Sequence, residues 1–468
     1  MLPEAISGYL SARREEHLAA LSELLSIPSL ATDQPGAAEA CRRAADWLAG
    51  RLAAAGLKAD VVDAPGRPVV IASRQVNPHK PTLLIYGHYD VQPPDPLELW
   101  TSPPFQPRVR DGYLYARGAC DDKGQLFAHL MAVEAWQRAG GGLPLNVKFL
   151  IEGQEEIGSP PLEGFLAARR ADLAADAIVI SDSEFFADGL PSITYALRGV
   201  VHVELTVKGP SQDVHSGIHG GALGNPVNVL AAMIASLHDD QGRVTIPGFY
   251  EDVLELSQQE RRDWQALPFD EAGYAASLGV KALSGGESGY SVLQRRWSRP
   301  TLDCNGIVGG YYGPGAKTII PAAASAKVSM RLVPNQDPDR IVEGLASYIR
   351  QHAQPGTVAE LSVQSKSRPV LLNRYGVAVE AACAALEEAF GRRPAMIRCG
   401  ASVPVTEVLQ RLLGLDAVLM GFALPDDNPH APNERFRLDQ LWRGALASAA
   451  LMNNLAAGWG GKPVGRSP

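Results

Sequence analysis

The sequence predicts an α/β protein whose mixed, mostly parallel sheet is sandwiched by helices and whose chain is interrupted by an inserted α+β domain. In residues 1–196, short apolar runs alternate with helical patterns, which is typical of a parallel sheet. In residues 197–366, strand-like runs alternate apolar and polar residues, as in an antiparallel sheet with one solvated face. The first pattern resumes in residues 367–468, so we expect the first domain to be discontinuous.

Length and composition restrict the class of protein. A chain of 468 residues is too long for one ordinary core, and 46% hydrophobic with 20% charged residues is an ordinary globular composition. The net charge of −8 argues against nucleic-acid partners and anionic membranes. The five cysteines are scattered without CxxC spacing, and no apolar run is long enough to span a membrane. We therefore expect a cytoplasmic protein.

Periodicity places the elements of the first domain in order. It predicts helices over 3–25, 37–55, 124–138, 162–168, 377–390 and 438–456, and strands over 58–62, 69–72, 82–86, 145–151, 177–180, 396–398 and 417–421. For the inserted domain it predicts strands over 202–207, 325–332 and 357–363, and helices over 226–237 and 337–352. Residues 239–300 are expected to be an irregular insertion, and the tail from Gly458 to be disordered.

Metal-capable side chains follow four of the apolar strands. They are His88 and Asp90 after 83–86, Glu155 and Glu156 after 148–151, Asp182 after 177–180, and His430 beyond 417–421. In an open parallel sheet, ligands bind at the carboxyl ends of the strands, so these groups can converge. Asp121 joins them just before a helix, where a carboxylate is either a cap or a ligand.

Each of these residues also has a structural interpretation, because a loop histidine can be solvated and an acidic pair can lie on the surface. The coincidence of several placements favours a metal site. Two histidines with carboxylates and no cysteine suit Zn, Mn or Co. The carboxylates exceed what one catalytic zinc takes, which indicates two ions bridged by one carboxylate. Of two adjacent glutamates, one can bind metal while the other moves the proton.

The motifs resemble those of the carnosinase-like dipeptidases. These belong to a family of dinuclear zinc metallopeptidases that includes aminoacylase, glutamate carboxypeptidase and succinyl-diaminopimelate desuccinylase. The resemblance covers nearly the whole chain in the right order: GHYDVQP (87–93), Trp100 to Phe105, LYARGACDDKGQ (114–125), EGQEEIGS (152–159), VISDSE (179–184), DVHSGIHGG (213–221), GPGAKTIIP (313–321), VSMRLVPNQ (328–336), GASVPVTE (400–407) and NPHAPNE (428–434).

The resemblance implies roles for single residues of the metal site. His88 and Asp182 would bind one ion, Glu156 and His430 the other, and Asp121 would bridge the two. Glu155 would be the general acid and base. Asp90 would orient the imidazole of His88.

The resemblance also implies that the inserted domain is a ferredoxin-like lid and dimerisation domain. There His215 would act in the partner subunit's active site of a homodimer, and Arg331 would bind the substrate carboxylate. The loop of Gly400, Ala401 and Ser402 would contact the substrate backbone. Without the resemblance, His215 would be read as a turn histidine and Arg331 as a solvated charge.

The function that follows is a two-metal hydrolase of dipeptides or short peptides, in which Glu155 activates a water that bridges the ions. We expect two divalent ions per subunit, zinc first, with Mn or Co as alternatives. One alternative is an N-acyl-amino-acid deacylase or a carboxypeptidase on the same fold, and a remote one is a non-catalytic metal- and peptide-binding scaffold. In the family, aspartate at position 182 accompanies peptidases that act on free-amine peptides, whereas glutamate accompanies deacylases and carboxypeptidases.

Overall fold

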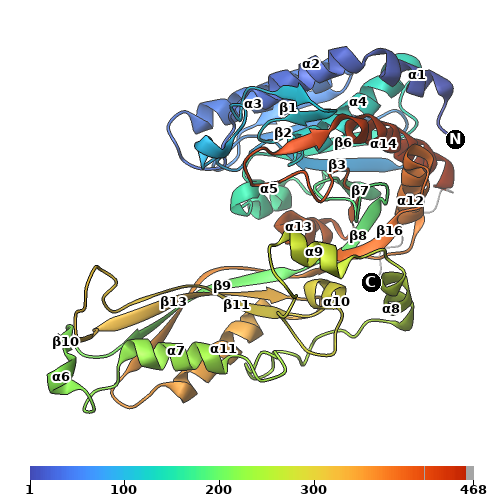
Figure 1. Cartoon of the computed structure of the whole chain (residues 1–468). Coiled ribbons are helices and arrows are strands. Elements are labelled where there is room, and N and C mark those ends of the chain that lie inside the picture. Colours follow the sequence, from blue (N-terminus) through green and yellow to red (C-terminus); the bar gives the residue numbers. More distant parts are fainter. Residues whose placement is uncertain (416, 460–468) are drawn as a thin grey trace. The chain divides into compact units, whose positions relative to one another are not determined.

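The structure is a computed structural model that describes residues 1–415 and 417–459. The chain forms two compact units (Figure 1). The first contains Met1–Tyr195, Leu372–Ile397 and the chain from Val405 onward, and the second contains Ala196–Leu371 and Arg398–Pro404. The sequence prediction divided the chain at 196/197 and 366/367, and it therefore assigned residues 398–404 to the first domain.

A large mixed sheet organises the first unit. Its strand order is β1-β2-β6-β3-β7-β17-β8-β15, and β16 pairs with β8. The central strands β6, β3, β7 and β17 are parallel, whereas the pairs on both sides of them are antiparallel. The predicted mixed sheet is confirmed. The strands are β1 (Lys58–Val62), β2 (Val69–Arg74), β3 (Thr82–His88), β6 (Asn146–Glu152), β7 (Ala177–Ile180), β8 (Ser192–Leu197), β16 (Ala395–Cys399), β17 (Ala417–Leu419) and, at the boundary of the two units, β15 (Val370–Leu371).

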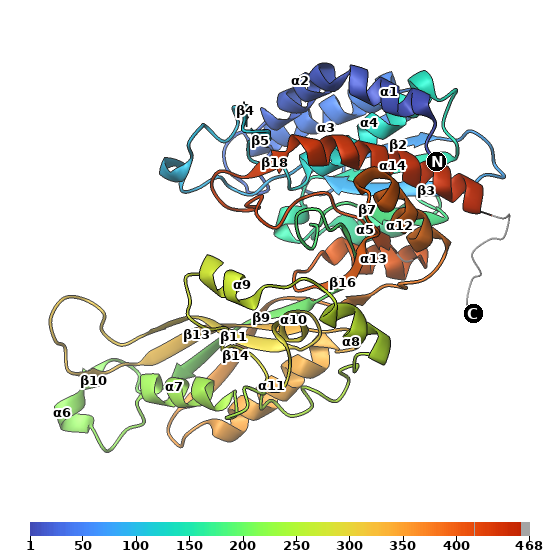
Figure 2. The same ribbon diagram turned by 45° about the vertical axis from the view of Figure 1, so that its right-hand side comes forward.

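Helices cover both faces of this sheet (Figures 1 and 2). Helix α4 packs on β3 and is covered in turn by α1, α2 and α14, so nearly all of its residues are buried. Helix α5 lies on the opposite face (Figure 2). The helices of this unit are α1 (Glu4–Ala12), α2 (Arg14–Leu25), α3 (Ala37–Ala54), α4 (Lys123–Ala139), α5 (Leu162–Ala168), α12 (Val377–Phe390), α13 (Pro404–Leu413) and α14 (Leu438–Gly458).

Several parts of the first unit and its sheet differ from the prediction, and strands β8 and β15 are among those that were not predicted. The single helix expected over 3–25 is broken at Arg13 into α1 and α2, and both of these helices pack on α4. Helix α13 and a small sheet of β4 (Arg108–Arg110), β5 (Tyr113–Tyr115) and β18 (Arg435–Arg437) were not predicted. Three-residue strands are too short to give a periodic signal. Most of the tail predicted to be disordered lies outside the described residues, although Gly458 ends α14.

The second unit has the topology of a ferredoxin-like fold. Its elements follow in the order β9 (Gly199–Lys208), α7 (Pro226–Ser236), β11 (Thr301–Gly309), β13 (Ala323–Leu332), α11 (Pro338–His352) and β14 (Val358–Ser367). The sheet order is β11-β13-β9-β14, with every pair antiparallel. Helices α7 and α11 pack on one face (Figure 1), and a short pair of β10 (Val214–His215) and β12 (Ile319–Ile320) lies beside α6 (Ser216–His219). The predicted α+β architecture is confirmed.

The insertion at 239–300 is more regular than predicted. It contains three short helices, α8 (Gln258–Gln265), α9 (Glu271–Ser277) and α10 (Val292–Trp297). Ser257 with Glu260 and Ser291 with Gln294 form capping boxes at the starts of α8 and α10. This serine-to-acid or serine-to-amide spacing is a helix signal that periodicity alone overlooked, because the helices are too short to show a repeat. Within the described part of the chain, no helix is long and apolar enough to cross a bilayer.

Candidate metal centre

The parallel strands of the first unit bring the predicted ligands to one edge of the sheet. His88 is the last residue of β3, and Asp182 lies two residues beyond β7. Glu155 and Glu156 form a single 3₁₀ turn, η2 (Glu155–Ile157), directly after β6. Asp121 precedes α4, and His430 lies in the loop after β17 with the positive φ of 61° that non-glycine residues rarely adopt.

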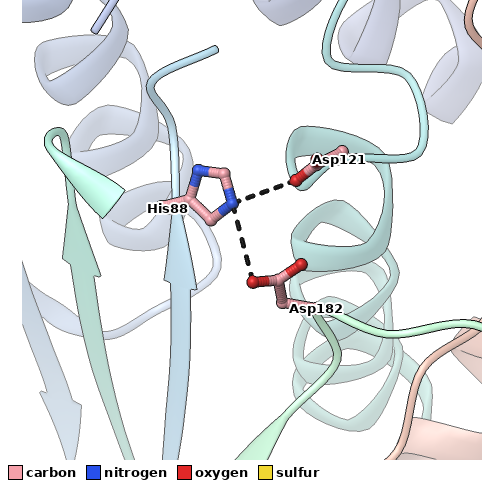
Figure 3. A group of neighbouring side chains, drawn as sticks. All are labelled: His88, Asp121 and Asp182. Atoms are coloured by element: carbon pink, nitrogen blue, oxygen red, sulfur yellow. Dashed lines mark ion pairs between the residues drawn. The ribbon is translucent and has the colours of Figure 1, made fainter. Parts of the chain in front are cut away.

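Asp121 lies between two histidines. Its Oδ1 is 3.2 Å from Nε2 of His88, and its Oδ2 is 2.9 Å from Nε2 of His430. On the first side, Oδ2 of Asp182 lies 3.9 Å from Nε2 of His88 (Figure 3). On the second side, Oε2 of Glu156 lies 3.1 Å from Nε2 of His430. One carboxylate is therefore shared between two His–acid groups.

The two groups have the composition of metal sites. In each of the sets His88–Asp121–Asp182 and Asp121–Glu156–His430, the potential ligand atoms lie within 4.8 Å of one another. Nε2 of His88 is buried and has no hydrogen-bond partner, as expected of an atom reserved for a ligand. Imidazole nitrogens with carboxylate oxygens fit a divalent ion such as zinc. The alternative of a helix cap is not supported, because the N-cap of α4 is Asp122 and its side chain makes no capping hydrogen bond.

Crowding of acids shifts the protonation equilibria at this edge. Burial, with the neighbouring Asp121, raises the pKa of Asp182 to about 7. Burial also raises the pKa of Glu155 well above its usual value, and Asp182 and Glu156 add to the effect. Hydrogen bonds to Asp121 and Glu156 raise the pKa of His430 to about 10. A bound cation would relieve the repulsion among these carboxylates, so their arrangement favours one.

Asp90 is fully buried and organises three neighbours. Its Oδ1 lies 3.4 Å from Nδ1 of His88, and its backbone oxygen lies 3.1 Å from the same nitrogen. Its carboxylate also accepts hydrogen bonds from the backbone N–H groups of Glu155 (3.2 Å) and Glu156 (3.0 Å). Asp90 therefore joins the end of β3 to the turn that carries both glutamates.

Two residues near the site were missed by the sequence analysis. The Gln92 side chain donates a hydrogen bond of 2.9 Å to Oε2 of Glu156. The buried carboxylate of Glu434 accepts from Arg117 and from the backbone N–H groups of Gly118, Cys120 and Asp121, and so fixes the loop before α4. Both lie inside quoted motifs, but the partners of Glu434 are distant in sequence and no local pattern reveals them.

The remaining predicted site residues lie in the second unit. Nη1 of Arg331 on β13 is 3.2 Å from Oγ of Ser402, so these two are brought together. The backbone oxygens of Gly400 and Ala401 accept hydrogen bonds from Nε and N of Arg198. His215 is exposed, and its Nδ1 accepts from the backbone N–H of Gly217. In the neutral imidazole, Nε2 therefore carries the hydrogen.

An α/β sheet whose parallel strands end in two His–acid groups sharing one carboxylate defines a metal-dependent hydrolase. A family model supports and narrows this class, because the one described as Peptidase family M20/M25/M40 matches residues 84–454. The chain belongs to this family and is a metallopeptidase that uses divalent metal.

Relatives of known name agree with the assignment. The chain is 32% identical to the Cys-Gly metallodipeptidase dug1 of Schizosaccharomyces pombe, over 96% of this chain and 97% of that protein. It is 31% identical to the crystal structure of human carnosine dipeptidase 1, with a TM-score of 0.82 over 98% of this chain and 100% of the other. An M20 family metallo-carboxypeptidase from Sulfolobus solfataricus is 33% identical, with a TM-score of 0.85 over 94% and 99% of the two chains.

Proposed function

We propose that this protein is a dipeptidase with two divalent ions per subunit, zinc being the first choice. The observation that supports this best is the position of the Asp121 carboxylate, one oxygen of which faces His88 while the other faces His430. His88 and Asp182 would hold one ion, and Glu156 and His430 the other. Relatives named for Cys-Gly and for carnosine support small free-amine peptides as the substrate class.

The ions would polarise the scissile carbonyl and acidify the attacking water. Glu155 is the base that takes the proton from this water and then delivers it to the leaving amine. Burial raises the pKa of Glu155 above its usual value, which makes its carboxylate a stronger base towards the attacking water. Asp90 holds the imidazole of His88 and the turn that carries Glu155 in fixed positions during the reaction.

The family resemblance assigns the remaining substrate contacts to residues that lie in the second unit. Arg331 offers a planar pair of donors to the C-terminal carboxylate of the peptide. The Gly400-Ala401-Ser402 loop would contact the peptide backbone. The Nε2 hydrogen of His215 would stabilise the developing oxyanion in the partner subunit of a homodimer.

We also propose a cytoplasmic location. The support is that none of the five cysteines forms a disulfide, which is typical of a reducing compartment.

The test is a substrate panel on metal-free enzyme reloaded separately with Zn or Mn. Each free dipeptide is paired with its N-acetylated twin, and a tripeptide series is added because one similar structure is a carboxypeptidase. We expect cleavage of the free dipeptides and its loss on acetylation. Glu155→Ala is expected to abolish turnover of every member. Preference for acetylated members, or equal rates for wild type and Glu155→Ala, would overturn the proposal.

A further inference from the structure

A buried ion pair ties the segment Arg398–Pro404 to the insertion at 239–300. Nη2 of Arg398 lies 2.5 Å from Oε1 of Glu260 on α8, and the two residues are only 3% and 8% exposed. Trp264, one turn further along α8, places its ring centroid 5.7 Å from the guanidinium carbon of Arg398. One helix of the insertion therefore holds this arginine with both a carboxylate and an aromatic ring.

Glu260 is itself rigidly held. Its Oε2 accepts a hydrogen bond of 2.8 Å from the backbone N–H of Ser257, while its own N–H donates to Oγ of Ser257. The capping box thus uses one carboxylate oxygen and leaves the other for Arg398. The ion pair is anchored to the start of a helix, where side-chain freedom is small.

The insertion also contacts the predicted substrate loop from a second side. Trp264 packs edge-on against Trp297 at the end of α10, with ring centroids 5.1 Å apart. The backbone oxygen of Arg296, the preceding residue, lies so near Gly400 that a Cβ there would be 3.1 Å from it. The two tryptophans therefore connect the ion pair to the place where the loop meets α10.

Hydrogen bonds through Arg198 connect the 400–402 loop to Arg331. Arg198 donates from Nε to the backbone oxygen of Gly400 (2.9 Å), and its own backbone oxygen accepts from Oγ of Ser402 (2.5 Å). Ser402 in turn lies 3.2 Å from the guanidinium of Arg331. A continuous chain of contacts runs from Glu260 through Arg398 and the loop to Arg331.

We propose that Arg398 and Glu260 are positioning residues that hold the 400–402 loop and, through Ser402, the guanidinium of Arg331 for the substrate carboxylate. The inference rests on the proposed function, in which Arg331 binds that carboxylate. A buried ion pair contributes little net stability, but it restricts the positions of the two side chains that form it. Displacing a substrate-binding group by about 1 Å can lower the reaction rate about a hundredfold. The insertion is then the part of the chain that sets recognition of the C-terminal carboxylate.

The experiment compares a free dipeptide with its C-terminal amide in wild type and in Glu260→Gln. Glutamine preserves the capping box and removes only the charge that faces Arg398. We expect kcat/KM for the free dipeptide to fall about 10- to 100-fold, mainly through KM, while the value for the amide changes less than about threefold. The ratio of the two substrates is therefore the readout, and a general loss of stability would not change it.

Glu287→Gln is the matched control. Glu287 lies in the same insertion and is buried, and it pairs with Arg299 through two hydrogen bonds of 2.6 and 3.0 Å. None of its hydrogen bonds or ion pairs reaches the 400–402 loop. This variant is expected to lose stability while keeping the acid-to-amide ratio of the wild type.

Arg331→Met distinguishes the proposed carboxylate-binding role of Arg331 from the positioning role of Arg398 and Glu260. If Arg331→Met leaves the acid-to-amide ratio unchanged, the proposed carboxylate-binding role is wrong. If Arg331→Met collapses the ratio but Glu260→Gln does not, only the positioning role is overturned. Should Glu260→Gln fail to fold, Arg398→Lys keeps the charge but removes the planar guanidinium, and its effect on the ratio decides in the same way.

Discussion

At the scale of single residues, the buried carboxylate of Asp90 joins two segments of the candidate metal centre. Its carboxylate lies beside the imidazole of His88 and accepts hydrogen bonds from the backbone of both glutamates. Its removal would disturb ligands of both proposed ions at once. The family resemblance anticipated the contact with His88, but the contacts with the backbone of residues 155 and 156 emerge only in three dimensions.

His129 carries a prediction about pH. Its ring is fully buried between Ser448 and Ser181, each with Oγ 2.7 Å from a ring nitrogen, and burial lowers its pKa to about 3. An exposed histidine titrates near 6.5. Below that pH the unfolded chain takes up a proton that the folded chain does not. The free energy of unfolding should therefore fall by about 1.4 kcal/mol per pH unit from this residue as pH drops from 6.5 towards 3.

Equilibrium unfolding of the metal-free protein at pH 7.5 and pH 5 tests this prediction. His129→Gln lacks the titrating group, so its destabilisation relative to wild type should shrink as pH falls. A destabilisation by His129→Gln that is the same at both pH values would contradict the prediction.

At the scale of elements, the approach of β17 to the end of β7 leaves no room for a side chain at Gly421. A Cβ there would lie 1.8 Å from the backbone oxygen of Ser183, the residue after Asp182. Because the obstructing atom belongs to the backbone, it cannot move aside cheaply, so Gly421→Ala should destabilise the first unit by about 1–3 kcal/mol. It should also lower metal content, since the displaced segment carries Asp182.

Thermal unfolding and metal analysis check the glycine prediction. Gly164 in α5 is the control, because a Cβ there would meet nothing within 4 Å. Gly164→Ala should be neutral or stabilising, since alanine favours the helix by about 0.5–1 kcal/mol. A Gly421→Ala protein with wild-type Tm and metal content would show that the strands can separate without cost.

Most of the large elements could be predicted from periodicity, because long helices and buried strands repeat their apolar residues. The run Ala177–Ile180 was placed to the residue. What could not be predicted depends on tertiary contacts. The helices on both sides of Arg13 pack on α4, and the pairing of Arg398 with Glu260 joins positions far apart in sequence. At the metal centre, the ends of the parallel strands predicted convergence, but not how the oxygens of Asp121 are divided between His88 and His430.

For the whole molecule, the proposed homodimer predicts complementation between inactive variants. If His215 acts in the partner's site, Glu155→Ala and His215→Ala protomers should each be nearly inactive alone. Mixed dimers formed by co-refolding contain one site in which both residues are intact. An equal mixture should therefore recover about a quarter of wild-type activity, because half of the dimers are mixed. No recovery, with mixed dimers demonstrated by differential tags, would place His215 in its own subunit's site, whereas wild-type activity of His215→Ala alone would place it outside catalysis.

The position of β17 has a consequence for biosynthesis. This strand lies between β7 and β8 in the sheet, yet the ribosome makes it only after the whole of β9 to β14. Translation proceeds at about 5–20 residues per second. The strands β7 and β8 are therefore synthesised on the order of ten seconds or more before β17, which pairs with both of them. His430 follows later still, so the proposed second metal site can form only after the loop that follows β17 has been synthesised. We expect newly made chains to depend on chaperones during this interval, because the unpaired edges of β7 and β8 are exposed to other nascent strands.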